Sequence, residues 1–331
     1  MSGLDRTIDH WAVLPVQAGR AALEAEIARA LAPAGGLDTE DGLLTTIARD
    51  LLDHGGKRLR PALALLAAEA GPGGATAALP FAAACEILHN ATLIHDDVID
   101  GAALRRGKPT VAAHWGNRVA LLAGDYLFAR ALTLVAQLGR PEVSVRLGRT
   151  VEHICQAEIE QIARAYDLSY SEPEYLELVR RKSALLIAEC CRSGALLGGA
   201  AENVVEAMFA YGQALGTAFQ IADDILDVVA ADASLGKPTG QDIQLGLLTL
   251  PVLRALESQP ALRPLIGRRM EMAGDVSQVL DLVRASDGVA YARARAEHYI
   301  LAAQQALAIL PSGEPRDSLV QVARFAVRRD H

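Results

Sequence analysis

Two short acidic motifs of identical spacing stand out, each within or at the end of an apolar stretch. They consist of Asp96, Asp97 and Asp100, and of Asp223, Asp224 and Asp227. Aspartates four residues apart lie on one face of a helix, about one turn from each other. Because like charges buried without a partner are costly, an Asp-Asp pair in a mostly buried helix indicates a bound cation.

The donor set of these motifs favours magnesium. Two carboxylate clusters that face one another form an oxygen-rich site for a hard cation, and Mg²⁺ takes carboxylate oxygens, keeps water ligands and bridges to phosphate oxygens. No set of histidines and cysteines favours zinc. A single motif of this kind is more often a solvated acidic helix end, but two copies in apolar helices favour a metal site.

Clustered basic residues indicate an anion beside the metal. The stretch from Gly55 to Pro61 contains three cations, at a predicted helix start where free backbone N–H groups also attract anions. For a lone lysine, a solvated surface charge is the commoner interpretation. The candidate cations are Lys57, Arg58, Arg60, Arg105, Arg106, Lys182 and Lys237.

Helical spacing of apolar residues, with glycine and proline at the breaks, predicts an all-α protein. One helix from Pro80 to Asp100 and another over about 203–231 present the two acidic motifs. Other helices are expected over Val16–Leu31, 40–54, Pro61 to about 71, 116–138, 141–166 and 173–197, and then in shorter pieces broken near Pro251, Pro260, Pro264, Gly288 and Pro311. No strand alternation is evident. We expect a single domain of long helices around a central cavity, with residues 1–40 as a variable lead-in and 41–331 as the helical core.

Composition narrows the class of protein further. The 331 residues carry a net charge of −8, and an acidic chain argues against a nucleic-acid partner. We find no apolar run of membrane-spanning length and no signal-peptide pattern, so we expect a cytoplasmic protein. The four cysteines lack zinc spacing, and we expect buried, reduced thiols.

In their order along the chain, these motifs resemble those of the trans-isoprenyl (polyprenyl) diphosphate synthases. The resemblance spans about residues 50 to 255 and rests on Gly55–Pro61, His95–Asp100, Arg105–Gly107, Gly124–Asp125, Lys182–Ala184, Phe219–Asp227 and Gly236–Pro238. It implies an isoprenoid-synthase fold, a homodimer, and allylic and isopentenyl diphosphates as substrates. It also implies Mg²⁺ as cofactor, three ions per active site, with Mn²⁺ as a substitute.

The resemblance implies a role for each motif residue. The metal ligands are Asp96, Asp100, Asp223 and Asp227, and Asp97 and Asp224 complete the two catalytic motifs together with Arg105 and Lys182. Isopentenyl diphosphate contacts Lys57, Arg60, His89 and Arg106. The allylic diphosphate contacts Arg105, Lys182, Ser183, Gln220 and Lys237. The allylic C–O bond then ionises, the isopentenyl double bond attacks the cation, and the departing diphosphate takes the proton.

Three positions carry a second interpretation or depart from the family. A lone histidine such as His89 on an apolar helix face is more often a core residue, although its place in the motif favours binding. Ser183 stands where the family often has threonine, whose hydroxyl can serve equally. Leu247 stands where many members carry lysine, so one cation is absent from that loop.

Product length should depend on the helix that precedes the first acidic motif. Leu88, Ala91 and Thr92 lie eight, five and four residues before Asp96, and five residues of helix measure about 7.5 Å. Small side chains at 91 and 92 let the tunnel continue, with Phe128 or Leu132 as a candidate floor. We therefore expect a product of about C30 to C50, with C20 as the alternative. Ala91 could also be one alanine among many.

Two further function classes compete with this interpretation. A terpene cyclase or head-to-head synthase also uses aspartate-rich helices, but the Gly55–Pro61 motif indicates a second diphosphate site, and only 4% of the chain is aromatic. A non-catalytic subunit of a heteromeric synthase is the alternative of another class. Both acidic motifs are intact, which favours the catalytic partner.

Overall fold

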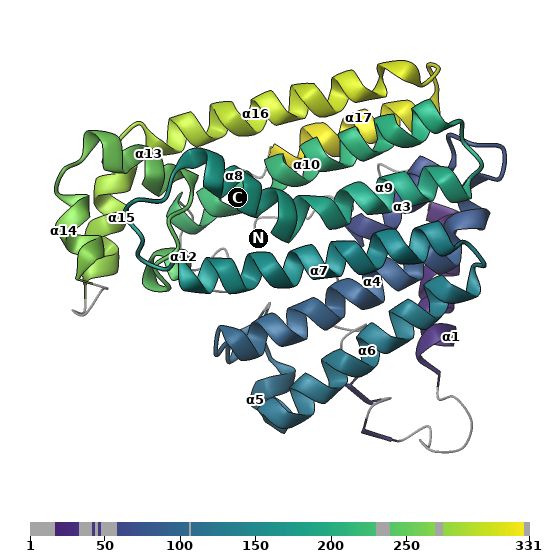
Figure 1. Ribbon diagram of the computed structural model, residues 1–331, viewed down its shortest axis with the longest axis horizontal. Coiled ribbons are helices and arrows are strands. Elements are labelled where there is room, and N and C mark those ends of the chain that lie inside the picture. The colour runs from purple at the N-terminus through teal and green to yellow at the C-terminus, as the bar shows by residue number, and fades with distance from the viewer. Residues whose placement is uncertain are drawn as a thin grey trace, which may run out of the picture. The chain divides into compact units, whose positions relative to one another are not determined.

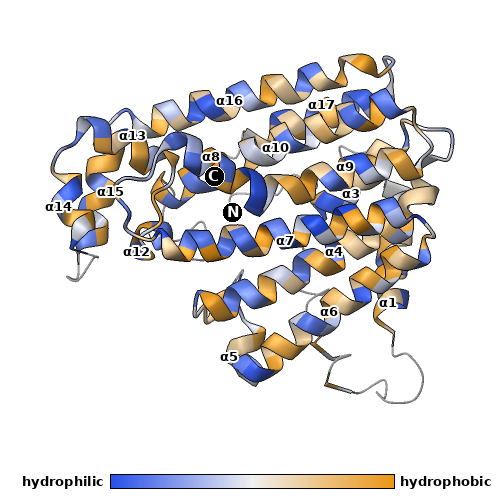
Figure 2. Cartoon of the chain, in the orientation of Figure 1, coloured by the Kyte–Doolittle hydropathy of each residue, from blue (hydrophilic) through white to orange (hydrophobic). Residues whose placement is uncertain are grey.

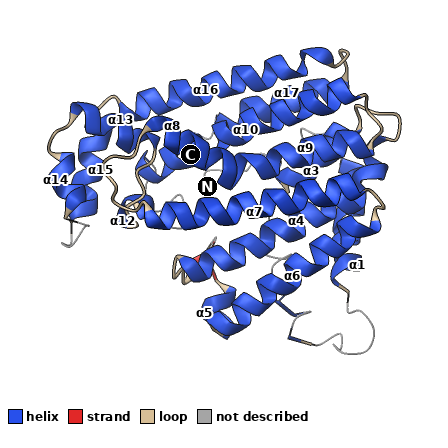
Figure 3. Ribbon diagram, viewed as in Figure 1, coloured by secondary structure: helices blue, strands red, loops and turns tan. Residues whose placement is uncertain are grey.

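Helices form nearly all the regular structure of the part of the chain that is described. The computed structural model describes residues 17–32, 42–43, 46–47, 58–105, 107–229, 239–268 and 274–327. Within them, the strands β1 (Leu104–Arg105) and β2 (Lys108–Pro109) form one short antiparallel pair, and the rest of the regular structure is helical (Figure 3). The predicted all-α class is confirmed. The single-domain boundary at residue 41 stays a prediction.

The chain forms two compact units, each assembled from segments that are distant in sequence. Unit 1 comprises residues 1–144, 190–208 and 309–322. Unit 2 comprises residues 145–189, 209–308 and 323–331. The first acidic motif therefore belongs to unit 1 and the second to unit 2.

Unit 1 is organised around α4 (Gly74–Ile99), which carries the first acidic motif. This helix packs against α1 (Gln17–Leu31), α3 (Leu59–Ala68) and α6 (Asn117–Gln137), and the short α5 (Val111–Trp115) packs on α6 (Figure 1). Every residue of α3 from Pro61 to Ala68 is buried. The apolar spacing that predicted the helix thus reflects a packed core.

Close helix contact in unit 1 requires glycine at one position of α9 (Leu185–Leu197). A Cβ atom added at Gly194 would lie 2.2 Å from the backbone oxygen of Ala64 in α3. No side chain fits there, so the two helix backbones touch.

Unit 2 carries the second acidic motif on α10 (Glu202–Val229). Its other helices are α7 (Pro141–Ala163), α8 (Glu172–Val179), α12 (Gln241–Gln244), α13 (Leu250–Ser258), α14 (Leu262–Gly267), α15 (Asp275–Ala285) and α16 (Gly288–Ala306), followed by the 3₁₀ turn η2 (Leu307–Ile309). Most of the last helix, α17 (Glu314–Val327), belongs to unit 1. The core of the unit includes Tyr175, Ile221, Ile225, Val252 and Ala292. Hydrophobic and hydrophilic residues are mixed along α16 (Figure 2), and its buried residues include Ala292, Ala296 and Ile300.

Two predicted helix boundaries were wrong. The helix α4 begins at Gly74, not at Pro80, and it contains Pro80 in its second turn, where the proline lacks the N–H of one backbone hydrogen bond. The helix expected over 173–197 is interrupted by a π-helical turn, η1 (Arg180–Ala184). The helix predicted over 40–54 falls almost entirely outside the described residues.

Two expectations about composition also need correction. By length and composition, α4 and α6 are long and apolar enough to cross a membrane, although 61% of the apolar window of α4 is buried, as in the core helix of a soluble protein. Of the four cysteines, Cys85, Cys190 and Cys191 are buried as expected, but Cys155 on α7 is exposed.

Candidate active site

The first acidic motif orients its three carboxylates differently. Asp97 is buried, and its Oδ1 accepts a hydrogen bond of 2.8 Å from Nε of Arg105 on β1. Asp96 is half-buried on another face of α4, and Asp100 is exposed just beyond the last residue of that helix. The middle carboxylate is therefore paired with a cation, and the other two carboxylates are more exposed to solvent.

The end of α4 is supported by a close contact with α6. Nε2 of His95 lies 3.1 Å from the backbone oxygen of Leu121, and the His95 ring stacks on Phe128. A Cβ atom added at Gly124 would lie only 2.1 Å from that Nε2. This close approach explains why glycine occupies position 124, beside the motif residue Asp125.

The second acidic motif repeats the burial pattern with different partners. Asp224 is buried, and it accepts hydrogen bonds from the Tyr175 hydroxyl at 2.5 Å and from Nε2 of Gln220 at 2.8 Å. Asp223 is half-buried on another face of α10. Burial raises the pKa of Asp224 to about 6, against the lowering effect of its two hydrogen bonds. Neutral donors, not a cation, hold this middle carboxylate.

The third aspartate of the second motif has its own backbone partners. The two oxygens of Asp227 accept hydrogen bonds from the backbone N–H groups of Gln241, at 3.2 Å, and Asp242, at 3.1 Å. The backbone N–H of Gly240 also donates to the carbonyl oxygen of Asp227. Asp227 thus fastens the chain after the 230–238 segment to the end of α10.

A pocket with a cavity volume of about 100 Å³ lies beside the second motif, and all of its lining residues belong to unit 2. Its polar lining brings together three predicted allylic-site residues, Lys182, Ser183 and Gln220. The Ser183 hydroxyl donates to Oε1 of Gln220 at 2.6 Å. The remaining lining residues are Gln161, Arg164, Tyr170, Tyr175, Leu178, Val179, Asp224, Asp242, Leu247, Leu248 and Thr249.

The wall that presents Lys182 and Ser183 is the π-helical turn η1. The backbone N–H of Leu185 bonds to the carbonyl oxygen of Arg180, five residues earlier, and α10 approaches so closely that a Cβ atom at Gly216 would lie 2.6 Å from Cα of Ala184. Single π turns inside helices occur frequently at functional sites, since they re-aim the side chains they carry.

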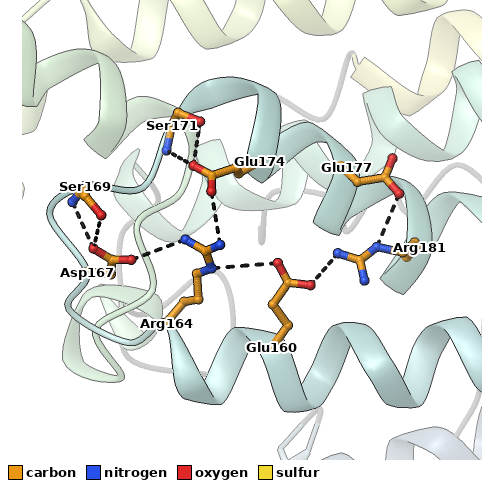
Figure 4. A network of polar contacts seen from close by, with 8 residues as sticks. All are labelled: Glu160, Arg164, Asp167, Ser169, Ser171, Glu174, Glu177 and Arg181. Carbon is orange, nitrogen blue, oxygen red and sulfur yellow. Dashed lines mark hydrogen bonds and ion pairs between the residues drawn. The ribbon is translucent and has the colours of Figure 1, made fainter.

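A network of ion pairs lies beside this wall, in the loop and helices around α8 (Figure 4). Arg164 pairs with Glu174 at 3.0 Å and with Asp167 at 3.3 Å, and Glu160 contacts both Arg164 and Arg181. Ser171 caps α8 through a reciprocal capping box with Glu174. The network ties the end of α7 to the start of α8.

The basic residues predicted to bind isopentenyl diphosphate are only partly described. Lys57, Arg106 and Lys237 lie outside the described residues. Arg60 is half-buried in the first turn of α3. His89 is half-buried on α4, three and seven residues before Thr92 and Asp96, which share its helix face and are also half-buried.

Arg58, counted among the anion-binding cations, has two internal partners. Its Nε lies 3.0 Å from Glu24 and its NH1 lies 2.8 Å from the buried Glu86. Burial lowers the pKa of Arg58, but the two carboxylates outweigh that effect and the pKa lies above its ordinary value. Arg58 has a left-handed backbone, with φ 47°, and directly precedes the first residue of α3. The motif therefore contributes fewer cations to an anion than its sequence indicated.

The candidate chain-length residues differ in burial. Leu88 and Ala91 have no exposed surface, whereas Thr92 is half-buried and donates to the backbone oxygen of His89 at 2.8 Å. On α6, Phe128 is half-buried and Leu132 is 43% exposed. Their role in product length stays a prediction.

The acidic residues fit a hard cation that shares its ligands with a substrate. Among the described residues, no group of three or more histidine, cysteine or acidic side chains converges on one point. The motifs provide carboxylate oxygens as metal ligands, and the carboxylates of Asp96 and Asp223 are half-buried. Mg²⁺ suits such a sparse site, because it keeps several waters and completes its shell with phosphate oxygens.

Sequence reasoning missed several residues of this site. Nothing in the sequence pointed to Tyr175 as the partner of Asp224, because the two are 49 residues apart. Glu158 and Gln161, which contact Lys182, lie three residues apart on α7, so their shared helix face was the one available signal.

Comparison with known proteins gives a consistent result. Residues 41–283 match the model of the polyprenyl synthetase family. Component 2 of the heptaprenyl diphosphate synthase of Geobacillus stearothermophilus is 41% identical over 313 residues, which cover 94% of this chain and 96% of the relative. The nonaprenyl diphosphate synthase of Mycobacterium tuberculosis is 39% identical, over 88% of this chain and 90% of the relative. The crystal structure of a polyprenyl synthase from Caulobacter crescentus, complexed with calcium and isoprenyl diphosphate, matches with a TM-score of 0.88 and 35% identity over 96% of both chains.

Proposed function

The chain belongs to the polyprenyl synthetase family and is a prenyltransferase, and from that premise we propose that it condenses isopentenyl diphosphate head-to-tail with an allylic diphosphate. The observation that carries this proposal is the shared pattern of the two acidic motifs. In each motif, the second aspartate is buried and hydrogen-bonded to another side chain. The first aspartate, Asp96 or Asp223, is half-buried. A half-buried carboxylate beside a buried one suits a divalent cation that keeps water and phosphate oxygens among its ligands, and each motif offers this arrangement.

The residues of the unit 2 pocket would bind the allylic substrate. The Lys182 ammonium, the Ser183 hydroxyl and the Gln220 amide would hold its diphosphate, with Lys237 and Arg105 as further cations. Lys57, Arg60, His89 and Arg106 would hold isopentenyl diphosphate. Charge on the leaving diphosphate is then stabilised by fixed cations and hydrogen-bond donors, which promotes ionisation of the C–O bond.

Enzymes of this family depend on a divalent metal, and we propose Mg²⁺, with three ions per active site and Mn²⁺ as a substitute. Asp96, Asp100, Asp223 and Asp227 would supply its protein ligands. When bound, the metal neutralises charge on the leaving diphosphate. The leaving diphosphate itself would accept the proton that is lost after the new carbon–carbon bond forms, since no side chain is assigned as the base.

The proposed product has about C30 to C50, with C20 as the alternative. Two relatives named for seven- and nine-unit products support the longer range. Small side chains at Ala91 and Thr92 leave room along α4 for a growing chain. Ala91→Phe and Thr92→Phe test this directly: the variant whose side chain faces the tunnel should release a shorter product, measured by chromatography with radiolabelled isopentenyl diphosphate. An unchanged length in both variants would remove α4 from the chain-length role.

The proposed assembly is a homodimer. Exposed leucines on α6, Leu121, Leu122 and Leu132, give this helix an apolar surface that a second subunit could cover. A relative named as component 2 of its enzyme raises the alternative that this chain works with a different partner, including the case of a non-catalytic subunit.

One experiment separates these cases. The purified protein alone is incubated with Mg²⁺, isopentenyl diphosphate and each allylic primer from C5 to C20, and the products are resolved by chromatography. We expect elongation that stops when EDTA removes the metal. Absence of product from the chain alone would favour the heteromeric alternative, and a C20 product would select the shorter length.

A further inference from the structure

The ammonium group of Lys182 is held by two residues of α7 that neither the motifs nor the family resemblance singled out. Its Nζ lies 2.8 Å and 3.0 Å from the two carboxylate oxygens of Glu158 and donates to Oε1 of Gln161 at 2.8 Å. The Lys182 side chain is 29% exposed and lines the pocket. It is therefore fixed in place without being closed off from a ligand.

The register between α7 and the π turn makes this contact possible. Arg181, the residue before Lys182, pairs with Glu160, two residues after Glu158, so neighbouring residues of η1 meet neighbouring positions of α7. Figure 4 shows Glu160 between Arg164 and Arg181, with Arg164 bound in turn to Asp167 and Glu174. The ion pairs thus fix how α7 and η1 lie along one another, so that Glu158 and Gln161 contact Lys182.

A lysine needs this restraint to act as a fixed charge. Its four-carbon stem has many rotamers, whereas stabilising charge on a leaving group requires a donor whose position is set before the reaction. An acidic partner and an amide acceptor together determine where the ammonium sits. Misplacement of such a group by about 1 Å can lower a rate by roughly a hundredfold.

We propose that Glu158 and Gln161 are positioning residues that hold the Lys182 ammonium in the pocket for the diphosphate of the allylic substrate. The inference rests on the proposed function, in which Lys182 binds that diphosphate. Glu158 does not line the pocket and acts through Lys182, whereas Gln161 lines the pocket and also accepts a hydrogen bond from the Lys182 ammonium.

Alanine substitutions at the two positions give the primary test. In steady-state assays of the full-length protein with Mg²⁺, Glu158→Ala and Gln161→Ala should each lower kcat/KM for the allylic diphosphate about tenfold. KM for isopentenyl diphosphate should stay within about twofold, because Lys182 is assigned to the other substrate. Glu158→Gln keeps an acceptor for the ammonium and should recover most of the lost rate. As a matched control, Glu152→Ala replaces an exposed glutamate of the same helix and should leave all constants unchanged.

A double-mutant cycle separates positioning from a purely structural role. In a Lys182→Ala background, adding Glu158→Ala should change kcat/KM by less than about twofold, since the residue to be positioned is gone. An equal loss in both backgrounds would overturn the inference, as would wild-type kinetics in both alanine variants. If the wild-type protein itself makes no product, the proposed function fails instead, and the two failures are distinct.

Discussion

The two acidic motifs have the same sequence pattern but different surroundings. Asp97 in unit 1 is compensated by the guanidinium of Arg105, a full positive charge. Asp224 in unit 2 is held by neutral donors, Tyr175 and Gln220, and its pKa is raised to about 6 by burial. A repeated motif therefore specifies which helix faces the carboxylates occupy, whereas the groups that pair with them depend on what the fold packs beside each motif.

The third aspartates differ as well. Asp100 lies beyond the end of α4 and is exposed, whereas Asp227 accepts two backbone N–H bonds at the start of α12. Unit 2 therefore uses its motif to organise the following loop. The first aspartates, Asp96 and Asp223, are alike in being half-buried, and they are the positions at which we expect the two motifs to behave alike.

The largest expected effect tests that equivalence. Asp96→Ala and Asp223→Ala should each lower kcat by roughly a thousandfold, because each removes a proposed ligand to the metal that stabilises the leaving diphosphate. Turnover and far-ultraviolet circular dichroism are measured together, and helix content should be unchanged. Asp281→Ala, at an exposed aspartate of α15, serves as the control. A near-normal rate in either motif variant would rule out its metal assignment.

The middle aspartates should differ in how much their partners stabilise the fold. Arg105→Ala removes the guanidinium that pairs with the buried Asp97 carboxylate, and we expect a loss of about 3 kcal/mol in the free energy of unfolding. Tyr175→Phe removes one neutral hydrogen bond and leaves Gln220 in place, for a loss of about 1 kcal/mol. Urea unfolding of both variants compares the two values. If Tyr175→Phe is the more damaging, the electrostatic contrast between the motifs is wrong.

The smallest expected effect concerns the third aspartates. Asp227→Ala leaves two backbone N–H groups without their acceptor and should lower the free energy of unfolding by about 1 to 2 kcal/mol. Asp100→Ala removes an exposed side chain and should change it by less than about 0.5 kcal/mol. Both are measured by urea unfolding in EDTA, so that metal binding does not contribute. Equal losses would show that Asp227 does not anchor the loop.

Local sequence signals predicted the helices well where the pattern was periodic and the ends were marked. The ends predicted for the helices around residues 116–138 and 203–231 lie within a few residues of α6 and α10. The π turn at η1 was not predicted, because it depends on how α10 and α7 pack against it. The helix start predicted at Pro80 was wrong because the residues before it, from Gly74 on, are also helical. A proline marks a helix start only when the residues before it are not helical.

Residue pairings were the least predictable part of the site. The sequence identified Arg58 and Arg105 as cations near an anion, but the fold brings Glu24 and Glu86 to the first and Asp97 to the second. Such partners are set by helix packing over many residues of separation. Residue type alone therefore did not predict which carboxylates of the chain pair with each arginine.

By itself, the sequence determined the helical class, the family and the positions of the acidic motifs, because periodicity and motif spacing are local properties of the chain. Only the tertiary structure decided which carboxylate of each motif is buried, whether a cation or a neutral donor compensates it, and which residues hold Lys182. Those outcomes depend on desolvation and on contacts between distant segments, and neither is encoded in any one stretch of the sequence.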